Sequence, residues 1–191
     1  MLTYLINETK EAVVAAITGA DDILSALRGA VKNQITGTMK DVSDVATTGV
    51  DSVAAIATGA ISGVGNVASS LTDATKGTIQ GAVNGVSELG GDVVGAISLA
   101  ASGISSGVSQ VGGDLGSTAV TAVQAAIEAA EGVGVNTTNA ARAAVVGVVK
   151  AADAVGTEAG ASVRTALLAA ASLPRDIVEA AIKGTDGGDT G

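Results

Sequence analysis

Two pairs of carboxylates are the side chains that could bind a cation. Glu88 and Asp92 stand four residues apart, and Asp41 and Asp44 stand three apart, so each pair would share one face of a helix. Carboxylate oxygens are the ligands that Ca²⁺ and Mg²⁺ prefer. Two acids on a solvated helix face more often serve only to keep a chain soluble. We therefore predict no metal site, no cofactor and no catalytic residue.

The composition excludes several kinds of chemistry. The chain of 191 residues has no Cys and no His. It therefore lacks a Ser–His or Cys–His nucleophile, a zinc site of the usual kind and a disulfide. It carries 19 acidic and 10 basic residues, for a net charge of −9, whereas nucleic-acid binding needs clustered cations. We expect neither an enzyme nor a nucleic-acid-binding protein.

Apolar residues recur with a period of eleven. From Ala20 to Ala170, 36 of the 42 positions at offsets 0, 3 and 7 of this period are apolar, against 47% for the whole chain. Eleven residues in three turns give 3.67 residues per turn, close to the 3.6 of an α-helix. The repeated residues therefore stay on one narrow helical face. The sequence predicts an all-α fold with low aromatic content.

The phase of this repeat does not slip between residues 20 and 170. Because an irregular loop would shift it, Gly90-Gly91 and Gly112-Gly113 need not form turns. We expect an elongated amphipathic helix, which would span roughly 225 Å if fully helical at 1.5 Å per residue. The alternative is a long helical hairpin that turns at residues 132–139, where turn-forming residues cluster.

The ends of the chain differ from its middle. We divide it into an N-terminal short helix (1–19), the eleven-residue-repeat region (20–171), and a short C-terminal helix with a polar tail (172–191). The first residues lack the basic start and the long apolar segment of a secretion signal. This favours an intracellular origin or an unusual export route.

Glycine makes such a helix unable to stand alone. The chain has 27 glycines, and each interior Gly costs a helix about 1 kcal/mol relative to Ala. A partner helix or an apolar surface must therefore induce the helix. Small residues four apart form a flat strip on which another helix can pack closely. We predict this role for Gly77, Gly81, Gly85, Gly103 and Gly107. The expected apolar seam consists of Val86, Leu89, Val93, Ile97, Ile104, Val108, Val111 and Leu115.

Three segments carry a resemblance to a known family: Thr-Gly-Thr-Met-Lys-Asp-Val at 36–42, Asn-Val-Ala at 66–68 and Lys-Gly-Thr-Ile-Gln at 76–80. Over roughly residues 30–115 the chain resembles the perilipins, and more loosely the synucleins. The resemblance implies a long amphipathic helix that coats a lipid droplet or vesicle. Residues 77–141 contain no base, so anionic membranes should repel this chain. A neutral lipid or polymer surface should not.

Three functions remain open at this level. The leading hypothesis is a non-enzymatic structural protein that self-assembles through its small-residue-rich helices into a filament, tube or sheet, with itself as partner. The alternative is a perilipin-like coat on a lipid droplet or another apolar inclusion. A further alternative is a glycine-zipper membrane hairpin, because the segments 52–72 and 93–113 contain no charged residue and are each long enough to cross a bilayer.

Overall fold

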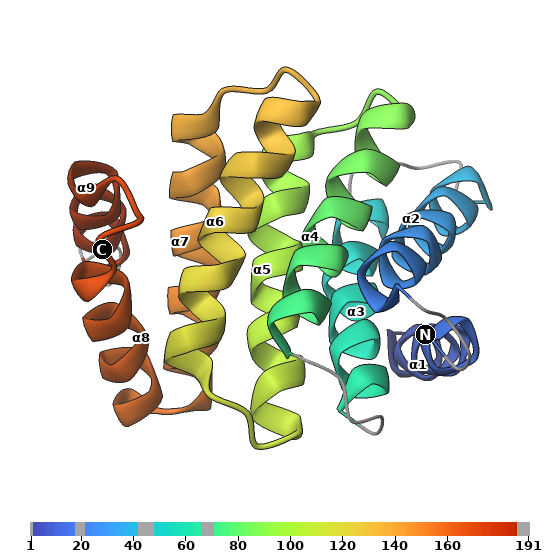
Figure 1. The fold of residues 1–191 in the computed structure, drawn as a ribbon, viewed down its shortest axis with the longest axis horizontal. Coiled ribbons are helices and arrows are strands. Elements are labelled where there is room, and N and C mark those ends of the chain that lie inside the picture. The colour runs from blue at the N-terminus through green and yellow to red at the C-terminus, as the bar shows by residue number, and fades with distance from the viewer. Residues whose placement is uncertain (1, 18–21, 42–47, 66–70, 187–191) are drawn as a thin grey trace.

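The described residues fold into a series of short helices (Figure 1). The computed structural model describes residues 2–17, 22–41, 48–65 and 71–186, which form nine α-helices and no strand. The helices are α1 (Leu2–Ile17), α2 (Ile23–Asp41), α3 (Thr48–Val64), α4 (Leu71–Glu88), α5 (Val93–Gln110), α6 (Leu115–Gly132), α7 (Thr137–Val155), α8 (Thr157–Ala169) and α9 (Arg175–Asp186). The predicted all-α class is confirmed.

The expected elongated helix does not form, and the reason lies in the length of the structural repeat. Helices α4, α5 and α6 each contain 18 residues, and a four-residue turn follows each one. One helix and its turn therefore occupy 22 residues, which is two periods of eleven. We call this length the double period. The apolar phase passes through every such turn unchanged, so an unbroken phase does not indicate an unbroken helix.

The turns repeat in their backbone geometry as well as in their length. A glycine with positive φ occupies the same place in three successive turns: Gly90 (+66°), Gly112 (+70°) and Gly134 (+73°). A residue with a side chain is strained in this conformation, whereas glycine adopts it readily because it has no Cβ. The amide of each following residue donates to the carbonyl five residues earlier, as in a Schellman helix end: Gly91 to Val86, Gly113 to Val108 and Val135 to Ala130.

A polar side chain then starts the next helix. Asp92, Asp114 and Asn136, again one double period apart, accept hydrogen bonds from the first amides of α5, α6 and α7. The pairs Gly90-Gly91 and Gly112-Gly113 thus form turns, contrary to the expectation that they need not. The break predicted at 132–139 exists, but it is one of several equivalent reversals.

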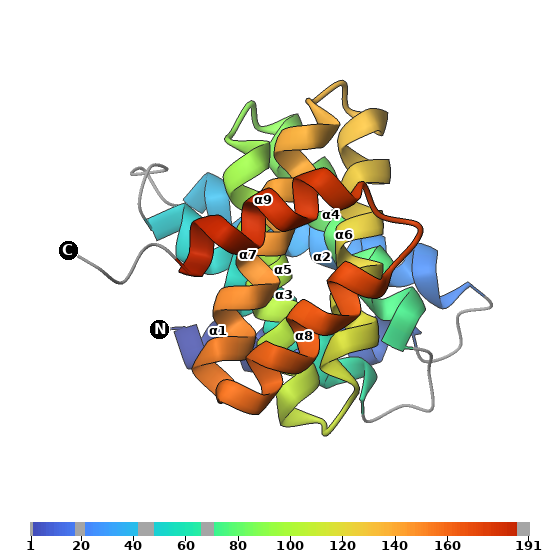
Figure 2. The ribbon, with the colours of Figure 1, turned by 90° about the vertical axis from the view of Figure 1, so that its left-hand side faces the viewer.

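The helices form two layers. Odd-numbered helices α1, α3, α5 and α7 pack side by side in one layer, and even-numbered helices α2, α4, α6 and α8 in the other (Figures 1 and 2). Each helix contacts only helices one or two positions away along the chain. This is the nearest-neighbour architecture of an α-solenoid. The terminal helices α1 and α2 lie at one end of the stack, and α8 and α9 lie at the other, where α9 crosses α7 (Figure 2).

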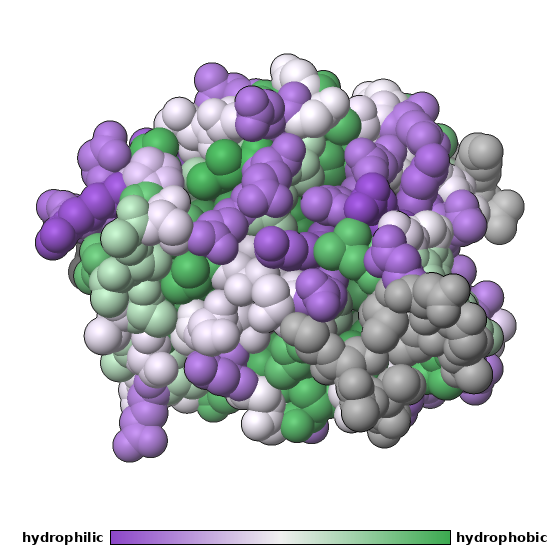
Figure 3. All heavy atoms as spheres, in the orientation of Figure 1, coloured by the Kyte–Doolittle hydropathy of each residue, from purple (hydrophilic) through white to green (hydrophobic). Residues whose placement is uncertain are grey.

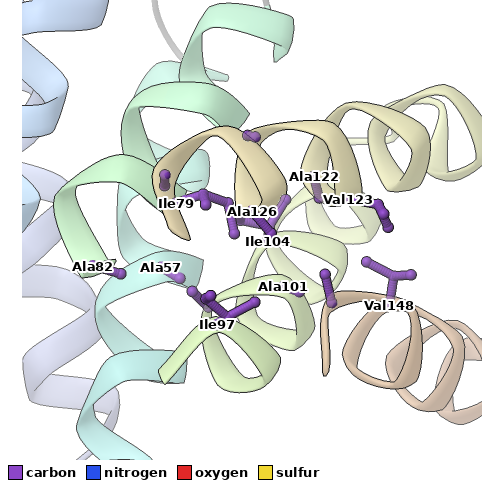
Figure 4. Close-up of a cluster of buried hydrophobic side chains, with 14 of the residues drawn as sticks. Ala57, Ile79, Ala82, Ile97, Ala101, Ile104, Ala122, Val123, Ala126 and Val148 are labelled. Carbon is purple, nitrogen blue, oxygen red and sulfur yellow. The ribbon is translucent and has the colours of Figure 1, made fainter. Parts of the chain in front are cut away.

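The core between the layers is built from small aliphatic side chains. Ile79, Ile97 and Ile104 are fully buried beside Ala101 and Val123 (Figure 4). Alanine and valine supply most of the other buried apolar positions, so the helices approach one another closely without aromatic residues. On the face drawn in Figure 3, hydrophobic residues lie in separate patches among hydrophilic and neutral ones.

The two short terminal helices are present in the structure. Helix α1 covers the expected N-terminal helix, and α9 begins directly after Pro174. Helix α9 runs on to Asp186 and so includes Gly184. Residues 187–191, which belong to the predicted polar tail, lie outside the described residues.

Candidate functional site

The three predicted packing glycines of α4 lie against α2. A methyl group at Gly81 would come within 2.8 Å of both the carbonyl oxygen of Arg28 and the Cβ of Val31. Gly77 and Gly85 lie in the same row and face the same helix. Because a backbone carbonyl cannot move aside cheaply, position 81 requires glycine at the observed helix separation, whereas a Cβ at Gly77 or Gly85 would make tight contacts of 3.1–3.3 Å with α2.

The two predicted packing glycines of α5 lie against α3 in the same way. A side chain at Gly103 would collide with the carbonyl oxygen of Ala54, and one at Gly107 would come within 2.8 Å of the Cβ of Ile61. All five predicted glycines thus join helices of one chain, within a layer. Contact with a second copy, for which the sequence suggested them, is not their role in this fold.

Two further glycines, outside the predicted set of five, pack in the same way. Gly59 of α3 lies against the carbonyl oxygen of Ile6 in α1, and Gly147 of α7 lies against that of Ser98 in α5. Together with Gly81 and Gly103 they belong to a series of positions spaced by whole multiples of the double period. A search at the double period rather than at eleven would have found them.

A hydroxyl group adds a hydrogen bond to one of these close contacts. The Oγ1 of Thr58 on α3 donates to the carbonyl of Gly103 on α5 at 3.0 Å and also lies 2.9 Å from the carbonyl of Ala54 in its own helix. One turn further along, Ser62 Oγ lies 3.3 Å from Gln110 Oε1. The α3–α5 contact is therefore both close and polar.

The predicted apolar seam packs inside the molecule. Five of its members are buried between the layers: Val86, Val93, Ile97, Ile104 and Val108. Leu89 and Leu115 are half-buried beside the turns, and Val111 is 36% exposed. Most of the seam therefore stabilises the monomer rather than offering a free surface.

The candidate carboxylate pair at Glu88 and Asp92 is divided between two structural roles. Glu88 forms an ion pair with Lys32 of α2, with 2.5 Å between Oε1 and Nζ, whereas Asp92 caps α5 by accepting from the amide of Gly95 at 3.0 Å. The side chains of Asp41 and Asp44 lie outside the described part of the chain. Among the described residues no three acids gather in a way that could hold a metal ion.

One ion pair joins the last two long helices. Arg164 of α8 binds Asp153 of α7 through two hydrogen bonds of 2.6 and 2.9 Å. These bonds, and the positive charge of Arg164, hold the pKa of Asp153 below its ordinary value of 3.8, against a smaller opposing effect of burial. Gly160 leaves room for the pair, because a side chain there would collide with Asp153 Oδ1.

Two shallow grooves lie on the described surface beside residues discussed above. One, of about 620 Å³, runs between the start of α6 and the exposed side of α8 and is lined mainly by Ala, Ser and Thr. The other, of about 460 Å³, lies over α1, α3 and α5 near Thr58 and Ser106. Neither lining brings together the nucleophile, base and charged groups that catalysis would need.

No family model, no curated protein and no solved structure matches this chain. One helix in the described residues, Val93–Gln110, is long and apolar enough to cross a membrane, and 56% of that window is buried inside the molecule. A helix packed in the core of a two-layer fold is equally apolar, so this helix need not cross a membrane. The function must therefore be argued from the packing of the helices.

Proposed function

We propose that this chain is a non-catalytic structural protein that self-associates into an extended assembly of stacked solenoids. The proposal rests on one observation, the exposed face of α8 at the end of its layer. Ala161, Thr165 and Ala169 are exposed on α8 along its groove with the start of α6, and Leu168 is 38% exposed. Soluble repeat proteins need terminal helices with polar outer faces.

The other layer ends differently. Helix α9 covers the end of α7 with Val178, Ala181 and Ile182 buried beneath it and with Arg175 and Lys183 exposed. That is the arrangement expected of a cap. At the C-terminal end of the stack, the described residues thus cap the odd-numbered layer but not the even-numbered one, and a second copy of the chain would cover α8.

Sedimentation velocity over a range of protein concentrations, without lipid or detergent, tests the proposal. We expect an average mass that rises with concentration, and extended particles by negative-stain electron microscopy. A monomer at every concentration would refute the proposal.

A coat on a neutral lipid droplet is the second candidate, supported by the resemblance over residues 30–115. It requires the layers to part, since Ile97 and Ile104 are completely buried. Amide hydrogen exchange with and without a neutral oil emulsion distinguishes the two. Coating predicts flotation with the oil and faster exchange between the layers, whereas self-association predicts neither.

A membrane hairpin of residues 52–72 and 93–113 would need another arrangement of the same helices. Glycines 103 and 107 of α5 meet residues 54 and 58 of α3 in the same order, so the two helices run parallel. Consecutive passes through a bilayer run antiparallel. We therefore rank this candidate last.

A further inference from the structure

We infer that helices α2 and α4 separate together from the odd-numbered layer while α6 stays in place, so that the stack opens at its N-terminal end. The inference concerns a single chain and does not depend on the proposed self-association. It rests on which buried hydroxyl groups have hydrogen-bond partners and on how each helix packs against its neighbours.

Threonine interrupts the apolar core between the layers. One position of the double period supplies each of the first eight helices with a residue that is at most 2% exposed: Thr9, Val31, Val53, Thr75, Ile97, Ala119, Ala141 and Val163. Both threonines of this series belong to the first four helices. Thr78, three residues after Thr75, is also fully buried, whereas the same position in α5, α6 and α7 holds alanine.

These three threonines differ from the buried hydroxyl groups of the later helices. The Oγ1 atoms of Thr9, Thr75 and Thr78 have no hydrogen-bond partner. The hydroxyls of α5 and α6 that are buried each bond a backbone carbonyl: Ser105, Thr118 and Thr121. A buried hydroxyl without a partner costs folding free energy, because it gives up its bonds to water and gains none. Among the described threonines and serines this cost falls on α1 and α4, and separation of the layers there removes it.

The apolar repeat is uneven in the same part of the chain. Six of its 42 positions are not apolar, and five of these six lie between residues 34 and 78. Two are in α2 (Gln34 and Thr38) and two are in α4 (Thr75 and Thr78). In α6 every position of the repeat is apolar. The even-numbered layer therefore adheres to the other layer less strongly through α2 and α4 than through α6.

Helices α2 and α4 nevertheless pack closely against each other. Gly81 brings the backbone of α4 into near contact with that of α2, and the two helices contact each other more extensively than either contacts a helix of the other layer. On the far side of α4, Ala125 of α6 holds the position that Gly81 holds in α4, and the contact between α4 and α6 is less extensive. The pair α2 and α4 therefore moves as one body when the layers part.

The absence of cysteine from the sequence permits a direct test by thiol labelling. Ala82→Cys in α4 and Ala126→Cys in α6 are a matched pair, because the two alanines are two double periods apart and both are 0% exposed in the core (Figure 4). A buried thiol is inert until it is exposed. At a concentration where the chain is monomeric, we expect an aromatic disulfide reagent to label the Ala82→Cys protein at least about tenfold faster.

The urea dependence of labelling distinguishes this opening from complete unfolding. Labelling of the Ala82→Cys protein should accelerate less steeply with urea than that of the Ala126→Cys protein, because local opening exposes less surface than unfolding. Val31→Cys on α2, also 0% exposed, should show the same shallow dependence as Ala82→Cys. A steep dependence at Val31→Cys would show that α2 does not move with α4.

Removal of the hydroxyls tests their part in the opening. Thr75→Val with Thr78→Val should slow labelling of the Ala82→Cys protein by at least about tenfold. Thr121→Val is the control, because its hydroxyl is bonded within α6, and it should not slow labelling. Circular dichroism establishes that each variant folds. If an alanine variant does not fold, Ile79→Cys and Val123→Cys replace the pair, since they are also two double periods apart and fully buried.

Two results would overturn the inference. One is labelling of the Ala126→Cys protein as fast as that of Ala82→Cys with the same urea dependence, which would leave complete unfolding as the sole route to the core. The other is no effect of the two threonine substitutions, which would show that these hydroxyls find partners in solution and do not weaken the contact between the layers.

Discussion

The hydroxyl of Thr58 on α3 and the carbonyl of Gly103 on α5 are hydrogen-bonded at 3.0 Å across two helices of the same layer. Thr58 is 5% exposed. The bond is possible because residue 103 has no side chain, which lets the two backbones approach. Close glycine packing and hydrogen bonding thus reinforce each other at this contact.

Replacing Thr58 with Val should destabilise the fold by about 1 kcal/mol, because it removes a buried hydroxyl that bonds the neighbouring helix while keeping the shape of the side chain. Urea unfolding followed by circular dichroism measures the change. Thr165→Val is the control, since that hydroxyl is exposed and bonds only within α8. An equal loss in both variants would show that the contact between helices contributes nothing of its own.

Gly103→Ala should destabilise the fold by about 1–3 kcal/mol, because the added methyl group collides with backbone rather than with a flexible side chain. Gly132→Ala, at an open position, should change stability by less than about 0.5 kcal/mol. Both are measured by urea unfolding. By the same reasoning, Gly81→Leu with Gly107→Leu should unfold the monomer. A folded double variant would contradict the packing described for α4 and α5.

The repeated turns should respond to substitution at two positions. Gly112→Ala forces a side chain into positive φ at a cost of about 1 kcal/mol, and Asp114→Ala removes the cap of α6 at a similar cost. Thermal unfolding of each variant measures the losses. Unchanged melting temperatures would mean that the helix phase alone, without turn chemistry, determines where the chain reverses.

The ion pair between Asp153 and Arg164 predicts a pH-dependent difference. Since the folded pKa of Asp153 lies below its ordinary value of 3.8, the pair stabilises the fold above that value, and the stabilisation is lost as pH falls through the lowered pKa. Asp153 is partly exposed, so Asp153→Asn should cost only about 0.5 kcal/mol at neutral pH. The difference in urea midpoint between the two proteins should shrink as the pH falls below 3.8 and through the lowered pKa of Asp153. Glu128→Gln is the surface control, and a difference that persists in acid would assign the effect to packing.

The helical class and much of the buried set could be predicted from the sequence. Positions such as Ile97, Ile104 and Val108 follow a helical period, and the burial of an apolar stripe depends on little else. The glycines at 77, 81 and 85 could likewise be recognised as packing residues from their four-residue spacing. The four-residue spacing does not indicate which helix these glycines contact, because that depends on the path of the chain.

The reversals were harder to predict, for a geometric reason. A turn is usually visible as a break in periodicity, but here Gly90 and Gly112 occupy turns whose length restores the phase. The stronger signal was chemical: a glycine followed two residues later by Asp or Asn recurs at 90, 112 and 134. A search for helix-capping residues and for glycines suited to positive φ would have located these turns, whereas the apolar periodicity did not.

The unit of one helix and its turn also bears on how such a chain can change in length during evolution. Each helix contacts only helices one or two positions away, so the packing of a helix does not depend on the total number of helices. Tandem duplication of two units, one helix for each layer, would lengthen the stack while leaving every retained neighbour its old partner. Duplication of a single unit would exchange the layers of everything that follows. Gene duplications in proteins of this shape should therefore survive in pairs of helices.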